Sequence, residues 1–145
     1  MRGECEMMKI FRGKRNDGGG WIYWNEFGEL TNSTGKIKTY RRDKKNGSAI
    51  CHYINQIKQF VDKITVEPCS GLKDLYGKLI FGGDILRWID TDGCEHFVEV
   101  GCRDGCFVIH PDSNVPELLS ESLELDMEIA GNVYDNPELL EDEDD

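Results

Sequence analysis

ILRWIDTDGCEHFVEVGCRDGCFVIH, residues 85–110, is the stretch that decides the fold. It holds three β-rich runs, residues 85–90, 95–100 and 106–110, separated by Asp92-Gly93 and Asp104-Gly105. Asp-Gly pairs between such runs predict hairpins, because both turn residues accept positive φ. We therefore expect a three-stranded antiparallel meander. The first run is apolar on both faces, which is typical of a strand covered on both sides in a small closed barrel or sandwich.

Closely spaced turn signals continue on the N-terminal side of this stretch. The glycine-rich turn at 17–20 separates β-rich runs at 9–13 and 21–24, and Asn46-Gly47 predicts a hairpin between strands at 37–41 and 49–54. Apolar residues recur at helical spacing from Ile50 to Ile64, so we expect a short helix over 56–62. Residues 63–67, in contrast, are typical of a strand that ends at Pro68.

The remaining segments complete a mainly β fold, all-β or β-rich α+β. We expect a turn at 73–77, a helical turn within 116–125, a last strand at 128–133 and a short helix that starts at Asn136-Pro137. The expected architecture is antiparallel meanders that form a small closed barrel or sandwich, with short helical pieces. The chain is one domain, or two intimate sub-domains at 9–68 (hairpins) and 69–140 (barrel), followed by a disordered acidic tail at 141–145.

The charge of the chain is strongly asymmetric. Residues 1–70 carry 13 Lys and Arg against 8 Asp and Glu, a formal charge of +5, whereas residues 71–145 carry 4 against 20, a charge of −16. Such a field acts on association rather than on fold. No signal peptide or membrane-spanning run is visible, so we expect a cytoplasmic protein whose six cysteines are reduced thiols.

Three sequence blocks resemble the YopX family of phage and prophage proteins. The first is Phe11-Arg12-Gly13-Lys14-Arg15 with Asp17 and Gly19-Gly20-Trp21-Ile22-Tyr23. The second is Val66-Glu67-Pro68, Ser70-Gly71-Leu72-Lys73-Asp74, Gly77-Lys78, Ile80-Phe81 and Gly83-Asp84-Ile85. The third is Ile129, Gly131-Asn132-Val133-Tyr134 and Asn136-Pro137-Glu138-Leu139-Leu140. They stand in family order along nearly the whole chain.

The resemblance implies a β-rich protein encoded in mobile genetic elements of bacteria, with no established reaction, no cofactor and no catalytic residues to transfer. The matched motif and turn residues are Phe11, Arg12, Gly13, Gly71, Leu72, Lys73, Asp74, Gly77, Gly83, Asp84, Gly131, Asn132, Tyr134, Asn136 and Pro137. Two departures stand out. The chain has Gly82-Gly83-Asp84 where the family usually has Glu-Gly-Asp, and it has Leu75-Tyr76 at a turn that is usually polar.

The turn residues allow two interpretations. In one, Lys73 and Asp74 form a binding pair on a rigid loop. In the other, which we favour, the glycines supply positive φ and the aspartate caps its own backbone. Leu75 and Tyr76 are unusual at a loop tip, which suggests burial against a partner or packing on the N-terminal half.

Cysteines and histidines gather near the meander, at Cys94, His96, Cys102, Cys106 and His110. Zinc binding is one interpretation, although the spacing is loose, and we favour ordinary strand residues. A catalytic cysteine with His52, His96 or His110 is another interpretation. It is disfavoured because the acidic surroundings raise the pKa of a thiol.

A basic set interleaved with aromatic residues suggests nucleic-acid contact, by Arg12, Lys14, Arg15, Tyr40, Arg41, Arg42, Lys44 and Lys45. The overall negative charge opposes this. We therefore predict a non-enzymatic interaction module whose partner is a host or phage protein or a second copy. Nucleic-acid binding is the alternative, and an enzyme of unknown class is the last choice. No membrane partner is expected.

Overall fold

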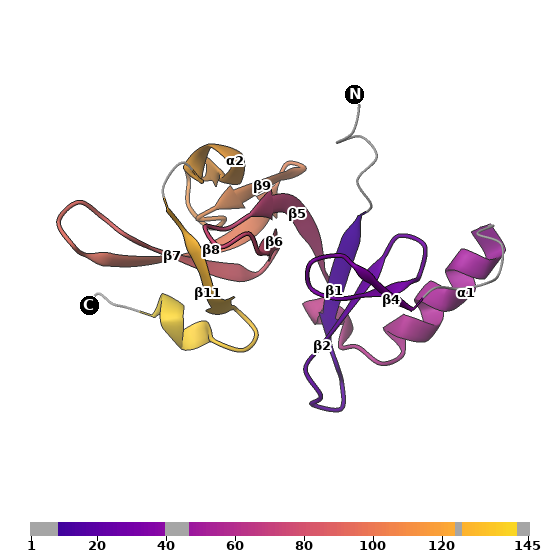
Figure 1. The fold of residues 1–145 in the computed structure, drawn as a ribbon. Coiled ribbons are helices and arrows are strands. Elements are labelled where there is room, and N and C mark those ends of the chain that lie inside the picture. The colour runs from indigo at the N-terminus through magenta and orange to yellow at the C-terminus, as the bar shows by residue number, and fades with distance from the viewer. Residues whose placement is uncertain (1–8, 40–46, 124–125, 142–145) are drawn as a thin grey trace, which may run out of the picture. The chain divides into compact units, whose positions relative to one another are not determined.

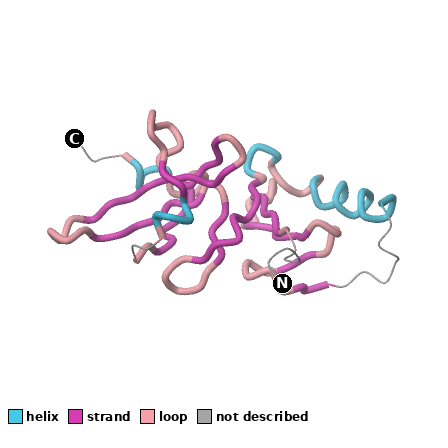
Figure 2. The backbone as a smooth tube through the Cα atoms, turned by 90° about the horizontal axis from the view of Figure 1, so that it is seen from above, coloured by secondary structure: helices cyan, strands magenta, loops and turns pink. Residues whose placement is uncertain are grey.

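The computed structural model describes residues 9–39, 47–123 and 126–141. The chain divides into two compact units, unit 1 (Met1–Cys69) and unit 2 (Ser70–Asp145). Strands make up most of the regular structure in both units, and the helices are short (Figures 1 and 2). The predicted β-rich fold class is confirmed.

Unit 1 is an antiparallel meander followed by a helix. Its elements are β1 (Ile10–Lys14), β2 (Trp21–Asn25), β3 (Leu30–Thr31), β4 (Ile37–Thr39), α1 (Gly47–Lys58), the 3-10 helix η2 (Lys63–Thr65) and the first part of β5 (Glu67–Lys73). The strand order is β4-β3-β2-β1-β5, and neighbouring strands are antiparallel. The predicted strands at 9–13 and 21–24 are confirmed as β1 and β2.

Helix α1 reaches the sheet of unit 1 through Ile57, which is buried with Trp24 of β2 and with Val61. A glycine permits a second close approach. Gly28 has a φ of +77°, and a Cβ at that position would lie 2.7 Å from the Cβ of Tyr53. The turn before β3 can therefore lie against the helix only where the side chain is a hydrogen atom.

The predicted hairpin at Asn46-Gly47 is wrong, because α1 occupies the stretch that was expected to form the return strand. Asn46 itself lies outside the described residues. Ile50, Ile54 and Ile57 recur every three or four residues, so a helix brings them to one face, whereas a strand would divide them between two faces. The helix ends at Lys58, and the predicted strand at 63–67 starts as η2.

Unit 2 is built around a longer antiparallel sheet. Its elements are the rest of β5, then β6 (Leu79–Phe81), β7 (Asp84–Ile89), β8 (Glu95–Arg103), β9 (Cys106–Ile109), β10 (Glu117–Leu118), α2 (Leu119–Ser122), β11 (Glu128–Asn132) and the 3-10 helix η3 (Pro137–Leu140). Strand β6 pairs with β5, and the other strands form a sheet in the order β10-β9-β8-β7-β11. The predicted meander is confirmed as β7-β8-β9, as is the last strand, β11.

The core of unit 2 lies on one face of the meander, where Leu86, Val98, Val100 and Ile109 are buried with Ile80, Leu119 and Met127. Strand β7 is covered on both sides at its centre, since Ile85 and Leu86 are each 0% exposed. No closed barrel is found among the described residues, because the sheet ends at β10 and β11. Strand β10 has only two residues, both exposed, which is too little backbone to close a barrel.

Among the described residues, four hairpin turns share one hydrogen-bond pattern. An Asn or Asp starts the turn, a glycine with positive φ follows three residues later, and the side-chain oxygen accepts the N–H groups two and four residues on. The turns start at Asn25, Asn32, Asp74 and Asp90, with glycines at 28, 35, 77 and 93. A three-residue loop that ends in a left-handed glycine is a common hairpin connection.

The two predicted Asp-Gly turns differ in length. Asp104 and Gly105 have φ values of 55° and 82°, and they form the predicted tight turn between Arg103 and Cys106. The Asp92-Gly93 pair lies inside a longer loop that starts at Asp90. No helix among the described residues is long and apolar enough to cross a membrane.

We expect Gly28→Ala to destabilise unit 1 more than Gly18→Ala does. Both glycines have positive φ, +77° and +82°, so each alanine costs about 1 kcal/mol through its left-handed backbone. At Gly28 the methyl group would also meet Tyr53, which adds about 1–3 kcal/mol, whereas nothing lies within 4 Å at Gly18. Urea denaturation followed by tryptophan fluorescence gives the free energies of unfolding. Equal losses would contradict close packing of the turn on α1.

Candidate functional site

The turn between β5 and β6 exposes two apolar side chains on a rigid support. The Asp74 carboxylate accepts hydrogen bonds from the backbone N–H groups of Tyr76 and Lys78, each at 2.9 Å, and of Ile129 at 3.0 Å. The N–H of Leu75 donates to the carbonyl of Met127 at 2.9 Å. Leu75 is 50% exposed and Tyr76 is 67% exposed, whereas Asp74 is only 7% exposed. We call Leu75 and Tyr76 the apolar tip.

Asp74 therefore stabilises the turn, and its geometry does not support the other interpretation, a binding pair with Lys73. The carboxylate of Asp74 points into the turn and toward β11, while Lys73 is exposed. The favoured alternative, an aspartate that caps its own backbone, is confirmed. The apolar tip is not buried, since Leu75 is half exposed and Tyr76 is two-thirds exposed.

A second buried carboxylate lies at the start of β7. Asp84 is 1% exposed and accepts a hydrogen bond from the N–H of Phe81 at 2.7 Å. The backbone of Gly83 makes two hydrogen bonds: its N–H donates to the carbonyl of Val100, and its carbonyl accepts from the N–H of Val133, each at 2.8 Å. Gly83 and Asp84 thus turn the chain from β6 into β7 and fix the residues that follow β11.

The segment after β11 is held in the same way. The side-chain oxygen of Asn132 accepts from the N–H groups of Tyr134 and Asp135, and the side-chain oxygen of Asn136 accepts from the N–H of Asn132. A Cβ on Gly131 would lie 2.3 Å from that Asn136 oxygen, so glycine is required there. Pro137 starts η3 as predicted, but Asn136 does not cap this helix with its side chain.

The basic residues proposed for nucleic-acid contact are not presented together by the described part of the chain. Arg12 is 6% exposed and its guanidinium lies 4.7 Å from the centre of the Trp21 ring, so its assignment to a surface contact is wrong. Lys14 is half-buried in β1. Tyr40, Arg41, Arg42, Lys44 and Lys45 lie outside the described residues.

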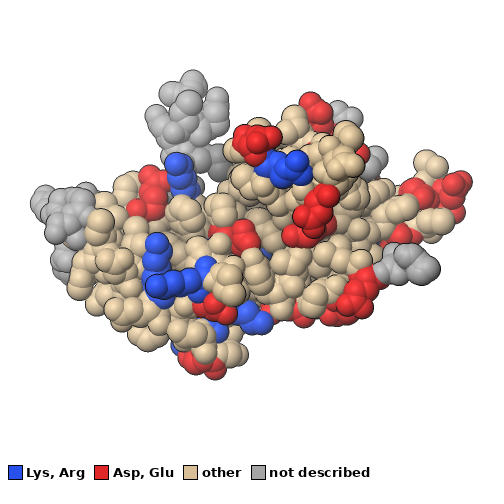
Figure 3. Space-filling view, turned by 180° about the vertical axis from the view of Figure 1, so that it is seen from behind, with Lys and Arg blue, Asp and Glu red and all other residues tan. Residues whose placement is uncertain are grey.

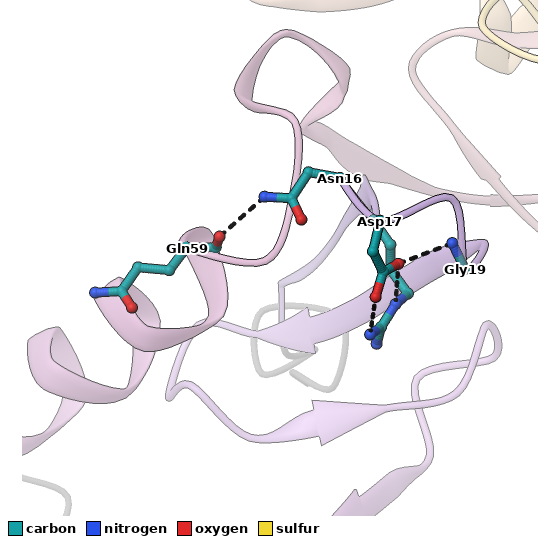
Figure 4. Close-up of polar contacts among 5 residues, drawn as sticks. Asn16, Asp17, Gly19 and Gln59 are labelled. Carbon is teal, nitrogen blue, oxygen red and sulfur yellow. Dashed lines mark hydrogen bonds and ion pairs between the residues drawn. The ribbon is translucent and has the colours of Figure 1, made fainter.

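Arg15 is engaged by a neighbour. Its guanidinium contacts both carboxylate oxygens of Asp17, at 2.7 and 3.0 Å, and the N–H of Gly19 also donates to Asp17 (Figure 4). The pair is exposed. The Arg15 hydrogen bond, together with the Gly19 N–H, lowers the pKa of Asp17 to about 2. Beside it, the Asn16 amide donates to the carbonyl of Gln59, which ties the turn to the chain after α1.

Unit 1 contains a groove of about 880 Å³ that the sequence analysis did not predict. Residues from the sheet and from the end of α1 line it, including Ile22 of β2, Leu30 of β3, Lys38 of β4, Ile57 of α1 and Phe60. Strand alternation places Ile22 on the face of β2 that carries Trp24 and packs toward α1, whereas Trp21 and Tyr23 belong to the opposite face. The groove depends on where α1 lies against the sheet, which no local sequence pattern indicates.

The cysteines and histidines of unit 2 do not converge. Cys102 lies opposite Phe107 and Cys106 lies opposite Arg103, so the two cysteines point to opposite faces of the sheet. No group of three or more His, Cys, Asp or Glu side chains in the described residues could hold a metal ion. The geometry at 102 and 106 therefore does not support the zinc interpretation.

His96 has a local partner set. Its ring stacks on Trp88 with centroids 4.8 Å apart, and its Nε2 lies 2.7 Å from a carboxylate oxygen of Asp90. The hydrogen bond to His96, with a further one from the Cys94 N–H, lowers the pKa of Asp90. This arrangement stabilises the loop between β7 and β8.

The two units differ in surface charge. On the face drawn in Figure 3, acidic side chains dominate unit 2, and most of the basic ones belong to unit 1. One cation of unit 2, Arg87, is itself paired with Glu95 and with Glu128. The charge asymmetry of the sequence is therefore carried by separate folded units.

We expect Asp74→Asn to lower the free energy of unfolding by about 1–3 kcal/mol. The three backbone N–H groups bond to both carboxylate oxygens of Asp74, whereas an amide side chain has only one acceptor oxygen. Asp112→Asn, at an exposed position in unit 2, is the matched control and should change stability by less than about 0.5 kcal/mol. Urea denaturation followed by circular dichroism measures both. Identical stabilities for the two variants would refute the bracing role of Asp74.

We expect the Asp17 carboxyl group to titrate near pH 2 in the folded protein, below its usual pKa of 3.8. Because the folded-state pKa is lowered, the stabilisation from this pair is complete above about pH 4 and is lost as the pH falls through 2. NMR titration of the side-chain carbonyl carbon measures the midpoint. Arg15→Gln should return it toward 3.8, and a midpoint that does not move would contradict the assigned cause.

Comparison with known proteins agrees with the resemblance seen in the sequence. No curated protein matches the chain at a significant level. A family model described as YopX protein matches residues 10–141 of the 145 residues. The matched range contains every strand and helix described above. The chain belongs to the YopX family.

Proposed function

We propose that this protein is a non-enzymatic protein-interaction module of a phage or prophage, which acts in the cytoplasm of the bacterial host. In this proposal the apolar tip of unit 2 inserts into a basic partner protein. Family membership supports the phage setting. The observation that carries the binding role is the exposure of Leu75 and Tyr76 on a turn that Asp74 holds rigid.

Rigidity of the turn favours binding. The backbone on both sides of Leu75 and Tyr76 is fixed by hydrogen bonds to the buried carboxylate and to β11, so little backbone entropy is lost on association. Tyrosine is enriched among the residues that dominate interface energies, because it buries a large area and fixes only two torsion angles. These two side chains thus have the properties of an anchor.

The apolar tip differs from the tips of the other turns with the same hydrogen-bond pattern. The turns that start at Asn25, Asn32 and Asp90 have Glu26-Phe27, Ser33-Thr34 and Thr91-Asp92 at the same two positions, so none of them carries two apolar residues. The turn geometry therefore does not require apolar residues at the tip. Their presence at 75 and 76 is explained by contact with a partner.

The charge of unit 2 favours a basic partner. Residues 71–145 have a formal charge of −16, which attracts cationic surfaces over long range and raises the rate of encounter. Close to the apolar tip, Lys73 and Lys78 are exposed, so the charge there is mixed. We expect the tip contact itself to be apolar and the rest of unit 2 to supply the attraction.

The polar residues of the motifs support a binding role rather than a catalytic one. Asp74, Asp84 and Asn132 accept hydrogen bonds from the backbone and are at most 9% exposed, so their side chains are nearly inaccessible to a substrate.

The test is affinity capture from host lysate with quantitative mass spectrometry, on the full chain and two variants. We expect a basic protein to be captured by the wild type and to fall about tenfold with Leu75→Ser combined with Tyr76→Ser, because the anchor is lost. Val115→Ser, at a side chain of unit 2 that is 78% exposed, is the matched control and should capture as much as the wild type.

Salt provides a second readout in the same experiment. The captured protein should be released as ionic strength rises, because screening removes the attraction of unit 2. If the double variant captures the same proteins in the same amounts as the wild type, the apolar tip is not the binding site and the proposal fails.

A further inference from the structure

We propose that the groove of unit 1 binds the acidic segment 137–145, PELLEDEDD, of a second copy of this chain. The surface involved is separate from the apolar tip. The inference goes beyond the proposed function and does not depend on it.

The groove is large enough for several side chains. Its volume of about 880 Å³ lies near the upper end of the range of about 300–1,000 Å³ that is usual for ligand sites. Apolar walls come from β2, β3 and α1, and Phe60 at the edge of the groove is 55% exposed. A large aromatic ring left this open next to other apolar side chains indicates a surface that a ligand covers.

The polar part of the lining selects the charge of the ligand. Arg15 and Lys38 line the groove, and no Asp or Glu is among the described residues that form its walls. A basic ligand would find no counter-charge there, whereas a carboxylate would find Lys38 and the donors of Arg15 that do not face Asp17.

The uncharged polar groups suit a peptide. Asn32, Gln56 and Gln59 lie around the groove, and each amide side chain offers both a donor and an acceptor. Peptide backbone needs such partners when it is removed from water. An acidic peptide with aliphatic side chains matches the apolar, cationic and amide residues of the groove together.

The chain itself contains such a segment. Residues 137–145 carry Leu139 and Leu140 next to six Asp or Glu residues and no Lys or Arg. Leu140 is 38% exposed in the 3-10 helix η3, so its side chain is accessible. The leucines match the apolar walls, and the carboxylates match Lys38 and Arg15.

The charges of the two units favour a second copy as the source. Unit 1 is positive and unit 2 is strongly negative, so two molecules attract each other when unit 2 of one approaches unit 1 of the other. This contact joins different surfaces on the two partners. Repeated from molecule to molecule, it closes into a ring or continues as a chain.

The first experiment uses a fluorescent synthetic peptide of residues 137–145 and the full-length protein. We expect saturable binding that weakens with salt and weakens roughly tenfold with Lys38→Glu or Phe60→Ser. Lys9→Glu, an exposed lysine of unit 1 outside the groove lining, is the matched control and should change affinity by less than about twofold. A peptide with residues 141–145 replaced by Gln and Asn, PELLQNQNN, should also bind roughly tenfold more weakly.

The second experiment tests assembly by sedimentation velocity over a series of protein concentrations at low salt. We expect wild-type association that is lost in the chain truncated after Leu140 and in Lys38→Glu, but kept in Lys9→Glu. The variant with Leu75→Ser and Tyr76→Ser should still associate and still bind the peptide. Its behaviour therefore separates this inference from the proposed function.

Four results would overturn the inference. They are no peptide binding at low salt, equal affinity for PELLEDEDD and PELLQNQNN, a strict monomer at every concentration, and association unaffected by the truncation. A single-stranded oligonucleotide that binds in the groove and that the acidic peptide cannot displace would also overturn it, in favour of a nucleic-acid site.

Discussion

The hydrogen bonds of one buried carboxylate, Asp74, connect the local turns of this protein to its long-range structure. One oxygen of Asp74 organises the turn between β5 and β6, and the other accepts from the N–H of Ile129 in β11, 55 residues away in the chain. A backbone N–H group left without a partner away from water is costly, so the contact fixes β11 beside the turn. The neighbouring bond from Leu75 to Met127 belongs to the same junction.

The same chemistry recurs at the other junctions of unit 2, where short polar side chains accept bonds from nearby backbone. Asp84 does so before β7, and Asn132 and Asn136 do so after β11. Glycine is placed where a Cβ would collide or where φ is positive, as at Gly131 and Gly77. Many residues of the YopX motifs thus stabilise turns.

Among the described residues, two surfaces carry the proposals made above. The apolar tip projects from a braced turn in unit 2, and the groove of unit 1 combines apolar lining residues with cations. Neither surface is explained by the packing of its own unit. The two units have opposite net charges, and the two proposals therefore give the tip a basic partner and the groove an acidic one.

The sequence by itself determined the features that depend on nearby residues. Asp104-Gly105 forms a tight turn because both residues adopt positive φ without help from the rest of the chain, and the strands on either side follow from it. The capping by Asp74 was also predictable, because its carboxylate accepts hydrogen bonds from N–H groups only two and four residues away. The spacing of an Asn or Asp and a glycine three residues later is also present in the sequence at 25, 32, 74 and 90. It occurs at 16 and 17 as well, so the spacing alone does not identify the turns.

Tertiary structure decided whatever depends on residues far apart in the chain. Asn46-Gly47 predicted a hairpin, but burial of Ile57 against Trp24 favours a helix over that local preference. Arg12 reads as a surface cation, yet it is buried over Trp21, because the strand pairing of β1 with β2 places it there. The groove draws its walls from residues 15 to 60, and no local pattern encodes their meeting. Backbone preferences depend on each residue and its neighbours in the sequence, whereas burial depends on the whole folded unit.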